Sequence, residues 1–161
     1  MISLKKRNLG NRGFTIVELL IVIVVIGILA LLVITTYSGI QAKARNAKRQ
    51  TDIQAIQTQL EAFFSENGYY PSLANMNSST WLSTNMKSLD QNALIDPSNS
   101  DHSKTLADTA TAKQYAYHVT TSDDKTCGAT DPATDCAKYT LTAEYEGTVN
   151  GSTTYEKSNL D

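Results

Sequence analysis

The sequence predicts an α+β fold in which a long N-terminal helix packs its second half against a small antiparallel sheet. The first half of that helix is predicted from residues 14–34, a strongly apolar run in which Glu18 is the one charged residue. The second half is predicted from apolar residues that recur every three or four positions as far as residue 66. Alternating apolar and polar residues near the C-terminus predict the sheet.

The apolar run is long enough to cross a membrane. As a helix, the 21 residues 14–34 span about 31 Å, close to the thickness of the hydrocarbon core of a bilayer. A secretory signal peptide fits less well, because its apolar region is shorter and ends at a small-x-small cleavage motif, and residues 33–38 at the end of this run offer no A-x-A pattern. The residues before the run are basic and include no acid, which favours a cytoplasmic N-terminus and a translocated C-terminal part. The basic residues are Lys5, Lys6, Arg7 and Arg12.

Beyond the apolar run the helical pattern continues. The apolar stripe expected to face the rest of the protein comprises Ile40, Ala44, Ala47, Ile53, Ile56, Leu60, Phe63 and Phe64. The residues between them are expected on the solvent face, where anionic lipid headgroups are a secondary contact for the basic ones. These basic residues are Lys43, Arg45, Lys48 and Arg49. Asn67-Gly68 followed by Pro71 marks the end of the helix, which we expect to run from about residue 14 to residue 66.

We expect three or four antiparallel strands, of which two are marked by alternation and a third by the hairpin turn that precedes it. They are residues 115–119, 139–146 and 152–157. In the second of these, Glu144 and Glu146 are expected to face solvent with Thr140 and Thr142. The residues expected to face the helix are Tyr139, Leu141, Ala143 and Tyr145. Asn150-Gly151 is typical of a tight hairpin turn. Residues 71–112 should form a connecting loop with a short helix around residues 81–89 and a turn at Asp96-Pro97.

Glu18 is the unusual residue of the apolar run. A carboxylate costs up to about 3 kcal/mol at the centre of a membrane helix and less near its ends. Glu18 could simply reach the headgroups near the start of the helix. A charged residue in such a segment is nevertheless a functional candidate whose partner has to be found.

The residues around Glu18 resemble a known processing site. Gly13-Phe14-Thr15-Ile16-Val17-Glu18-Leu19, preceded by a short basic leader, closely resembles the start of type IV prepilins and related pseudopilins. The resemblance implies a pilin fold. It also implies that a membrane-embedded prepilin peptidase cleaves between Gly13 and Phe14, that Phe14 becomes an N-methylated N-terminus, and that Glu18 pairs with the N-terminal amine of a neighbouring subunit during assembly.

The resemblance divides the chain into three parts. Residues 1–13 would be the leader peptide, residues 14–36 the helix that crosses the membrane and later forms the filament core, and residues 37–161 the rest of the helix with an extracellular α+β head. Many family members carry a proline shortly before the position of Tyr37. This chain has Thr35-Thr36 there, so we expect a helix without a sharp kink.

The function implied by the resemblance is structural. The chain would be a subunit of a type IV pilus, held in the cytoplasmic membrane before assembly and extracellular afterwards. Its partners would be other copies of itself, the prepilin peptidase, the pilus assembly machinery and the membrane. A pseudopilin or minor pilin of a type II secretion or DNA-uptake system is the close alternative. A protein of another class, anchored by a single helix and binding at the surface without polymerising, is also compatible with the sequence.

Cys127 and Cys136 are the only cysteines of the chain. Beyond the cytoplasmic membrane, where conditions are oxidising, they are expected to form a disulfide. A metal site is the alternative, but eight intervening residues and the lack of a paired histidine fit zinc spacing poorly. We therefore expect the disulfide and no metal.

Other functions find little support in the sequence. The chain has two histidines, His102 and His118, and neither a nucleophile motif nor a glycine-rich phosphate loop, so we expect neither an enzyme nor a cofactor. Residues 51–161 carry 6 basic and 15 acidic side chains, which argues against a nucleic-acid site. The acidic stretch 96–101 and the later acidic residues lack a calcium-loop pattern and are expected in solvated turns. These later residues are Asp123, Asp124, Asp131 and Asp135. Asn77 and Asn150 match the glycosylation sequon, but Asn150 is better explained by its turn.

Overall fold

The computed structural model describes residues 13–127 and 135–160, with only the main chain at Thr35. The chain divides into two compact units, Met1–Ile40 and Gln41–Asp161. One helix, α1 (Ile16–Asn67), contributes to both. The elements that follow it are α2 (Leu73–Met76), α3 (Ser79–Asn85), the short 3₁₀ helix η1 (Gln91–Leu94), β1 (Ala116–Thr120), β2 (Lys138–Val149) and β3 (Ser152–Ser158). The predicted α+β fold is confirmed.

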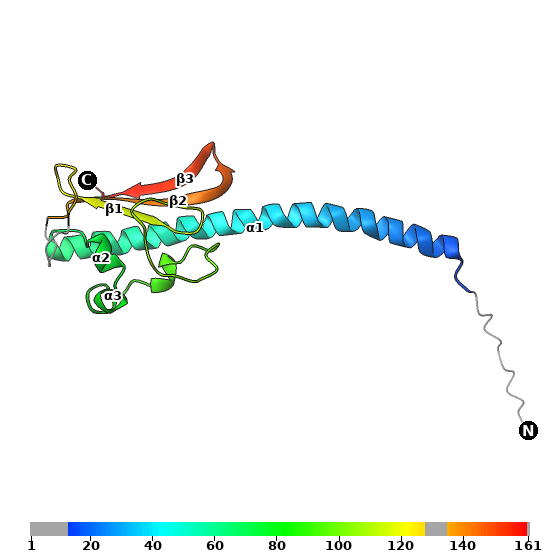
Figure 1. The fold of residues 1–161 in the computed structure, drawn as a ribbon, viewed down its shortest axis with the longest axis horizontal. Coiled ribbons are helices and arrows are strands. Elements are labelled where there is room, and N and C mark those ends of the chain that lie inside the picture. The colour runs from blue at the N-terminus through cyan, green and yellow to red at the C-terminus, as the bar shows by residue number, and fades with distance from the viewer. Residues whose placement is uncertain (1–12, 128–134, 161) are drawn as a thin grey trace, which may run out of the picture. The chain divides into compact units, whose positions relative to one another are not determined.

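The three strands form one antiparallel sheet in the order β1-β2-β3 (Figure 1). The hairpin between β2 and β3 turns at Asn150 and Gly151, which have φ values of 51° and 83°. Positive φ at both central residues is the requirement of the tight turn whose twist matches the flanking strands. The asparagine–glycine pair therefore predicted the position of this hairpin correctly.

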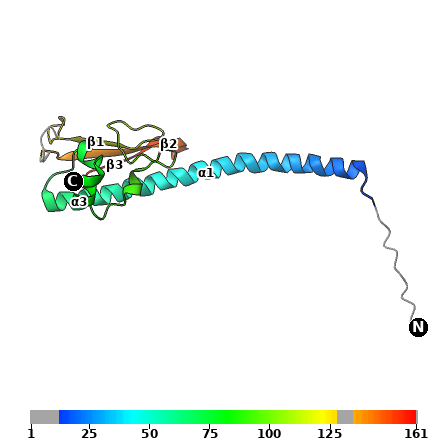
Figure 2. The same ribbon diagram turned by 60° about the horizontal axis from the view of Figure 1, so that its bottom comes forward.

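The core lies between the sheet and the second half of α1 (Figure 2). Ile53, Ile56 and Leu60 are fully buried on α1, and Tyr117 and Leu141 are fully buried on the facing side of the sheet. The segment between α1 and β1 adds further apolar residues, namely Met76, Leu82, Met86, Leu89, Ala93, Leu94 and Leu106. The apolar residues spaced by the helical period on α1 and those that alternate along the strands thus pack into one apolar cluster.

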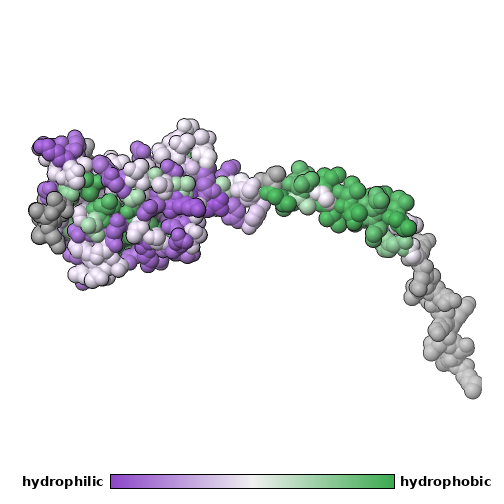
Figure 3. Space-filling model, viewed as in Figure 1, coloured by the Kyte–Doolittle hydropathy of each residue, from purple (hydrophilic) through white to green (hydrophobic). Residues whose placement is uncertain are grey.

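The first half of α1 exposes its large apolar side chains on all sides. Their exposed fractions run from 48% at Val25 to 85% at Ile16, and Figure 3 shows a continuous apolar surface over this segment. Thr36 donates from Oγ1 to the carbonyl oxygen of Leu32 (2.9 Å), and the helix continues through this point as predicted. Among the described residues, α1 is the one helix long and apolar enough to cross a membrane.

The predicted apolar stripe is wrong between residues 40 and 52. Ile40 is 58% exposed, and Ala44 and Ala47 are exposed as well. The buried positions here are polar, and they are Asn46, Arg49 and Asp52. The reason is that the groups packed against this stretch of α1 are carboxylates rather than apolar side chains, as described below.

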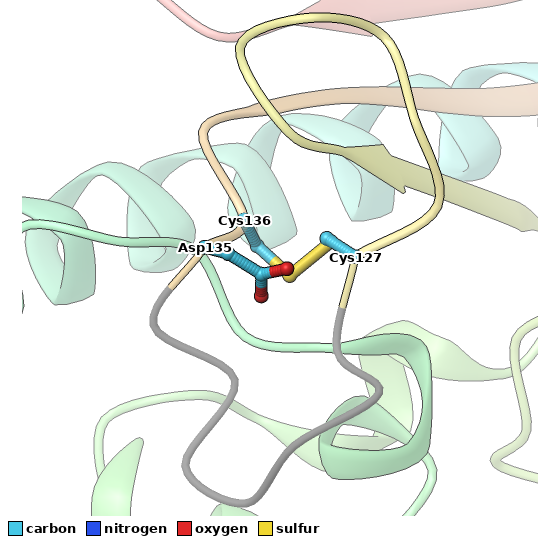
Figure 4. Close-up of side chains that lie close together, drawn as sticks. All are labelled: Cys127, Asp135 and Cys136. Atoms are coloured by element: carbon cyan, nitrogen blue, oxygen red, sulfur yellow. A yellow bond between two sulfur atoms is a disulfide. The ribbon is translucent and has the colours of Figure 1, made fainter.

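Cys127 and Cys136 form the predicted disulfide (Figure 4). The carboxylate of Asp135 lies close to the two sulfur atoms, but each sulfur is bonded to the other and neither is available as a thiolate ligand. The main chain ties this segment to the end of α1, because Tyr70 N donates to the carbonyl oxygen of Cys136 (2.8 Å). The disulfide therefore joins the segment after β1 to the residues just before β2, and the Tyr70 hydrogen bond ties these residues to the chain that leaves the helix.

Removing the disulfide should destabilise the Gln41–Asp161 unit. A closed ring of about ten residues is worth roughly 2.5–3 kcal/mol by the chain-entropy estimate. We expect a loss of about that size in the free energy of unfolding when Cys127 and Cys136 are both changed to serine, measured by urea denaturation of the exported chain in detergent. Reduction of the wild type should produce the same loss and leave the double variant unchanged. Peptide mapping that found two free thiols in the exported protein would contradict the prediction.

Candidate functional site

The residues predicted to be processed lie just before α1. Gly13 and Phe14 are not helical, and α1 begins at Ile16. Phe14 is 84% exposed, and nothing lies within 4 Å of the position where a side chain would begin at Gly13. The described residues therefore leave the peptide bond between Gly13 and Phe14 uncovered. Residues 1–12 of the predicted leader lie outside the described part of the chain.

Thr15 and Glu18 close the first turn of α1 by reciprocal hydrogen bonds. Glu18 N donates to Thr15 Oγ1 (3.2 Å), while Glu18 Oε2 accepts from Thr15 N (2.9 Å) and Thr15 Oγ1 (2.8 Å). This arrangement is a capping box, which satisfies amide groups that the start of a helix leaves without partners. The role of Thr15 was not predicted, although Thr-x-x-Glu directly before an apolar run is the sequence signal for it.

The capping box leaves part of the Glu18 carboxylate available. Its hydrogen bonds to the described residues all use Oε2, and Oε1 has none among them. A negative charge at a helix N-terminus also interacts favourably with the helix dipole. Gly13 and Phe14 thus directly precede the helix start that Glu18 caps, and one oxygen of its carboxylate is open to a further donor.

Comparison with known proteins gives a family model that includes this stretch, and several similar relatives. Residues 8–34 match the family model of the prokaryotic N-terminal methylation motif. The type IV major pilin protein PilA of Myxococcus xanthus is 41% identical over 68 residues, which are 42% of this chain and 31% of that protein. The type II secretion system core protein G of Dickeya chrysanthemi is 41% identical over 61 residues, which are 38% of this chain and 40% of that protein. The core protein G of Escherichia coli K12 is also 41% identical over 61 residues, covering 38% of this chain and 42% of its own length.

In its N-terminal part the chain is similar to type IV pilin-like proteins. The matched region spans less than half of the length of these relatives. No solved structure gives a significant match. In this pilin-like chain the family model covers the capping box and most of the apolar half of α1, while the Gln41–Asp161 unit lies outside that match.

Three of the four basic residues on α1 just after the apolar segment are paired within the pilin-like chain. Arg45 contacts Glu146, Lys48 contacts Asp52 at 2.7 Å, and Arg49 contacts Asp96 at 2.7 Å. Arg49 is fully buried, so the expectation of a solvated basic face is wrong for this residue. Its charge is stable there because oppositely charged partners are brought in from the loop after η1 and from β2.

These pairs belong to a larger polar cluster, called the Arg49 cluster here. It joins α1, the loop after η1, and β2, and its members are Arg45, Asn46, Arg49, Asp96, Ser98 and Glu146. All five N–H groups of the Arg49 guanidinium are used. Nε donates to Asp96 Oδ2 (2.7 Å) and Nη2 to Asp96 Oδ1 (3.0 Å) and Ser98 Oγ (2.8 Å). Nη1 donates to Asn46 Oδ1 (2.8 Å) and Glu146 Oε1 (3.0 Å).

The cluster lowers the pKa of one of its carboxylates, that of Glu146. Hydrogen bonds from Arg45 lower the pKa of Glu146 to about 2, and bonds from Ser98 and Arg49 act in the same direction against the effect of burial. The neighbouring carboxylate of Asp52 behaves differently, since burial raises its pKa although Lys48 and Tyr115 donate to it. Glu146 was expected on the solvent face of β2, and the structure instead directs it to α1.

The other predicted candidates are placed as follows. Asp96 is 1% exposed and bound to Arg49, so it is not available as a calcium ligand, and Asp124 pairs with Lys138. Asp131 lies outside the described residues. The side-chain amide of Asn77 donates to the carbonyl oxygen of Leu106 (3.0 Å) and accepts from Leu106 N (2.7 Å), so it serves the fold.

The charge of Glu146 should stabilise the head in a pH-dependent way. Because the folded pKa of about 2 lies below the ordinary value of 4.5, the stabilisation is complete above pH 4.5 and is lost as the pH falls from 4.5 towards 2. Thermal denaturation in detergent should therefore show a higher midpoint for wild type than for Glu146→Gln at pH 6, with the difference shrinking below pH 4.5. Glu144→Gln removes a carboxylate outside the cluster and is the matched control. A difference that stayed constant from pH 6 to pH 2 would contradict the prediction.

Proposed function

We propose that this chain is a structural filament subunit, a prepilin processed between Gly13 and Phe14 and polymerised through the apolar half of α1 into a type IV pilus. The observation that carries the proposal is the match of residues 8–34 to the N-terminal methylation motif, at a helix start where Glu18 is held with one oxygen open. The role is structural rather than enzymatic. Its partners would be other copies of the chain, the prepilin peptidase, the assembly machinery and the membrane.

The chemistry of assembly follows from the proposed cleavage. Hydrolysis after Gly13 leaves a cationic amine on Phe14, at the positive end of the α1 dipole, where a cation is unfavourable. The Glu18 carboxylate of a neighbouring subunit can neutralise it. Two unit charges 4 Å apart attract by roughly 4 kcal/mol at an effective dielectric constant of about 20, before desolvation is subtracted. A contact of this kind, repeated head to tail, sets the axial register of a filament.

A second candidate is a pseudopilin or minor pilin of a type II secretion or DNA-uptake system. The matches to the secretion system core protein G favour it, since their identity equals that of the match to the major pilin. Purified surface filaments, analysed by mass spectrometry in the producing strain and in its deletion mutant, separate the candidates. A major pilin dominates the filament and a minor component is present at trace level. A protein that is anchored by one helix and does not polymerise remains in the membrane fraction.

Processing should remove the leader of the proposed precursor. We expect the protein from membranes or filaments to lack residues 1–13 and to begin at Phe14, with a methyl group on the Phe14 nitrogen. Intact-mass measurement and N-terminal sequencing check both points. Replacement of Gly13 by a bulky residue such as valine should leave the leader attached, since a side chain there obstructs close approach of the protease. A mature protein that retained residues 1–13 would refute the proposed cleavage.

Glu18→Gln should separate membrane insertion from assembly. Glutamine can still complete the capping box, so the helix start and insertion should be intact. The lost charge leaves the amine of the neighbouring Phe14 without its counter-ion, and we expect at least a tenfold reduction in filament. Thr15→Ser keeps both the cap and the charge and should assemble normally. Filament yield from a strain whose only copy is the variant gives the result, and a wild-type yield would rule out the role of Glu18.

A further inference from the structure

The end of β2 departs from regular strand geometry at Glu146. Regular alternation would place residue 146 on the outer face with Thr142 and Glu144, which lie beside His118 of β1 and Glu156 of β3. Instead, Tyr145 and Glu146 both contact α1, through Gln50 and through the Arg49 cluster. The register between β2 and β3 shifts between Glu144 and Val149, and Gly147 has a φ of 78°. This bulge turns Glu146 from the outer face to the helix.

Asn46 compensates for the backbone pairing that the bulge disrupts. Glu146 N donates to Asn46 Oδ1 (2.9 Å), and Asn46 Nδ2 donates to the carbonyl oxygen of Glu146 (3.2 Å). One amide side chain on α1 thereby satisfies both main-chain groups of the bulged residue, which would otherwise be costly to bury. The bulge and the helix surface thus fit each other residue by residue.

The same cluster holds a second segment that is distant in the sequence. Asp96 and Ser98, in the loop after η1, bind the Arg49 guanidinium. Ser98 Oγ also donates to Glu146 Oε1 (2.9 Å), so the loop and the hairpin contact each other directly. Movement of the loop away from α1 removes the Ser98 donor from Glu146 and the Asp96 acceptor from Arg49, and movement of Glu146 removes an acceptor from Arg49 and Ser98.

Neither segment is fastened by the apolar core. The buried hydrophobic cluster has members up to Leu94 and again from Leu106, and its last member on β2 is Ala143. Residues 95–101 and 144–152 contribute none of its buried side chains. Their attachment to α1 therefore rests mainly on the Arg49 cluster, whereas β1 and the first part of β2 are held by apolar packing.

We propose that the Arg49 cluster is a latch that makes residues 95–101 and 144–152 one cooperative unit, which opens together while the apolar core stays folded. Breaking one member of a buried ion cluster leaves the remaining charges without compensation. Opening of the latch returns those charges to water, and the loss is limited to the segments that the latch holds. Local opening of this kind is measured by hydrogen exchange. The inference does not depend on the proposed role in a filament.

The test measures amide hydrogen exchange in each segment after a substitution in the other segment. Asp96→Asn alters the loop side, and we expect amides of residues 144–152 to exchange at least tenfold faster in the full chain in detergent. Glu146→Gln alters the hairpin side, and amides of residues 95–101 should respond likewise. In both variants the exchange of core amides such as those of Tyr117 and Leu141 should change by less than about threefold. The matched control is Asp124→Asn, which breaks the exposed ion pair with Lys138 at the start of β2 and should affect neither segment.

Each other outcome overturns the latch. A response confined to the mutated segment shows that the two segments are not coupled. An equal rise at Tyr117 and Leu141 shows that the cluster belongs to the global fold, and no rise at all shows that other contacts hold the segments. The wild type gives an independent reading if a variant does not fold. In native-state exchange with increasing urea, both segments should open with one common urea dependence, at a lower free energy than the core.

Discussion

The head depends on one constraint, that α1 supplies the surface on which every other element of the Gln41–Asp161 unit is ordered. Two kinds of contact share this surface. From Ile53 onwards the contacts are apolar and bury whole side chains, which gives stability in proportion to area. Between Arg45 and Asp52 they are ionic and directional, so they define the positions of the contacting segments, and their attraction is partly offset by desolvation. The helix therefore stabilises one end of the head and orients the other.

Arg49 shows how a charge can occupy an interior position. Its five N–H groups all find acceptors, two of them on the Asp96 carboxylate. A lysine at this position would bring three donors on a flexible chain and leave acceptors unsatisfied. The cluster is thus specific for arginine, and its neutrality depends on Asp96 and Glu146 arriving from chain segments 47 and 97 residues away.

Local signals predicted much of this structure. The long helix, the hairpin at Asn150-Gly151 and the disulfide follow from the period, the turn chemistry and the pair of cysteines, all of which act over short stretches of chain. The Thr15 cap was equally local and could have been predicted from its spacing to Glu18. The environment of Arg49 could not, because nothing near it in sequence indicates which carboxylates approach. The bulge that redirects Glu146 was hidden for the same reason, since strict alternation assigns that residue to solvent.

The all-round apolar surface of the first half of α1 restricts the path by which such a chain can travel. Exposing one large aliphatic side chain to water costs about 1.5–3 kcal/mol, and this segment carries more than a dozen of them. Release into water would therefore cost tens of kcal/mol, beyond what thermal motion supplies. The segment can leave lipid only by moving directly onto another apolar surface, without passing through water. In the proposed role, a filament built from such chains would grow and shrink at its junction with the bilayer, and the bilayer would hold the unassembled subunits.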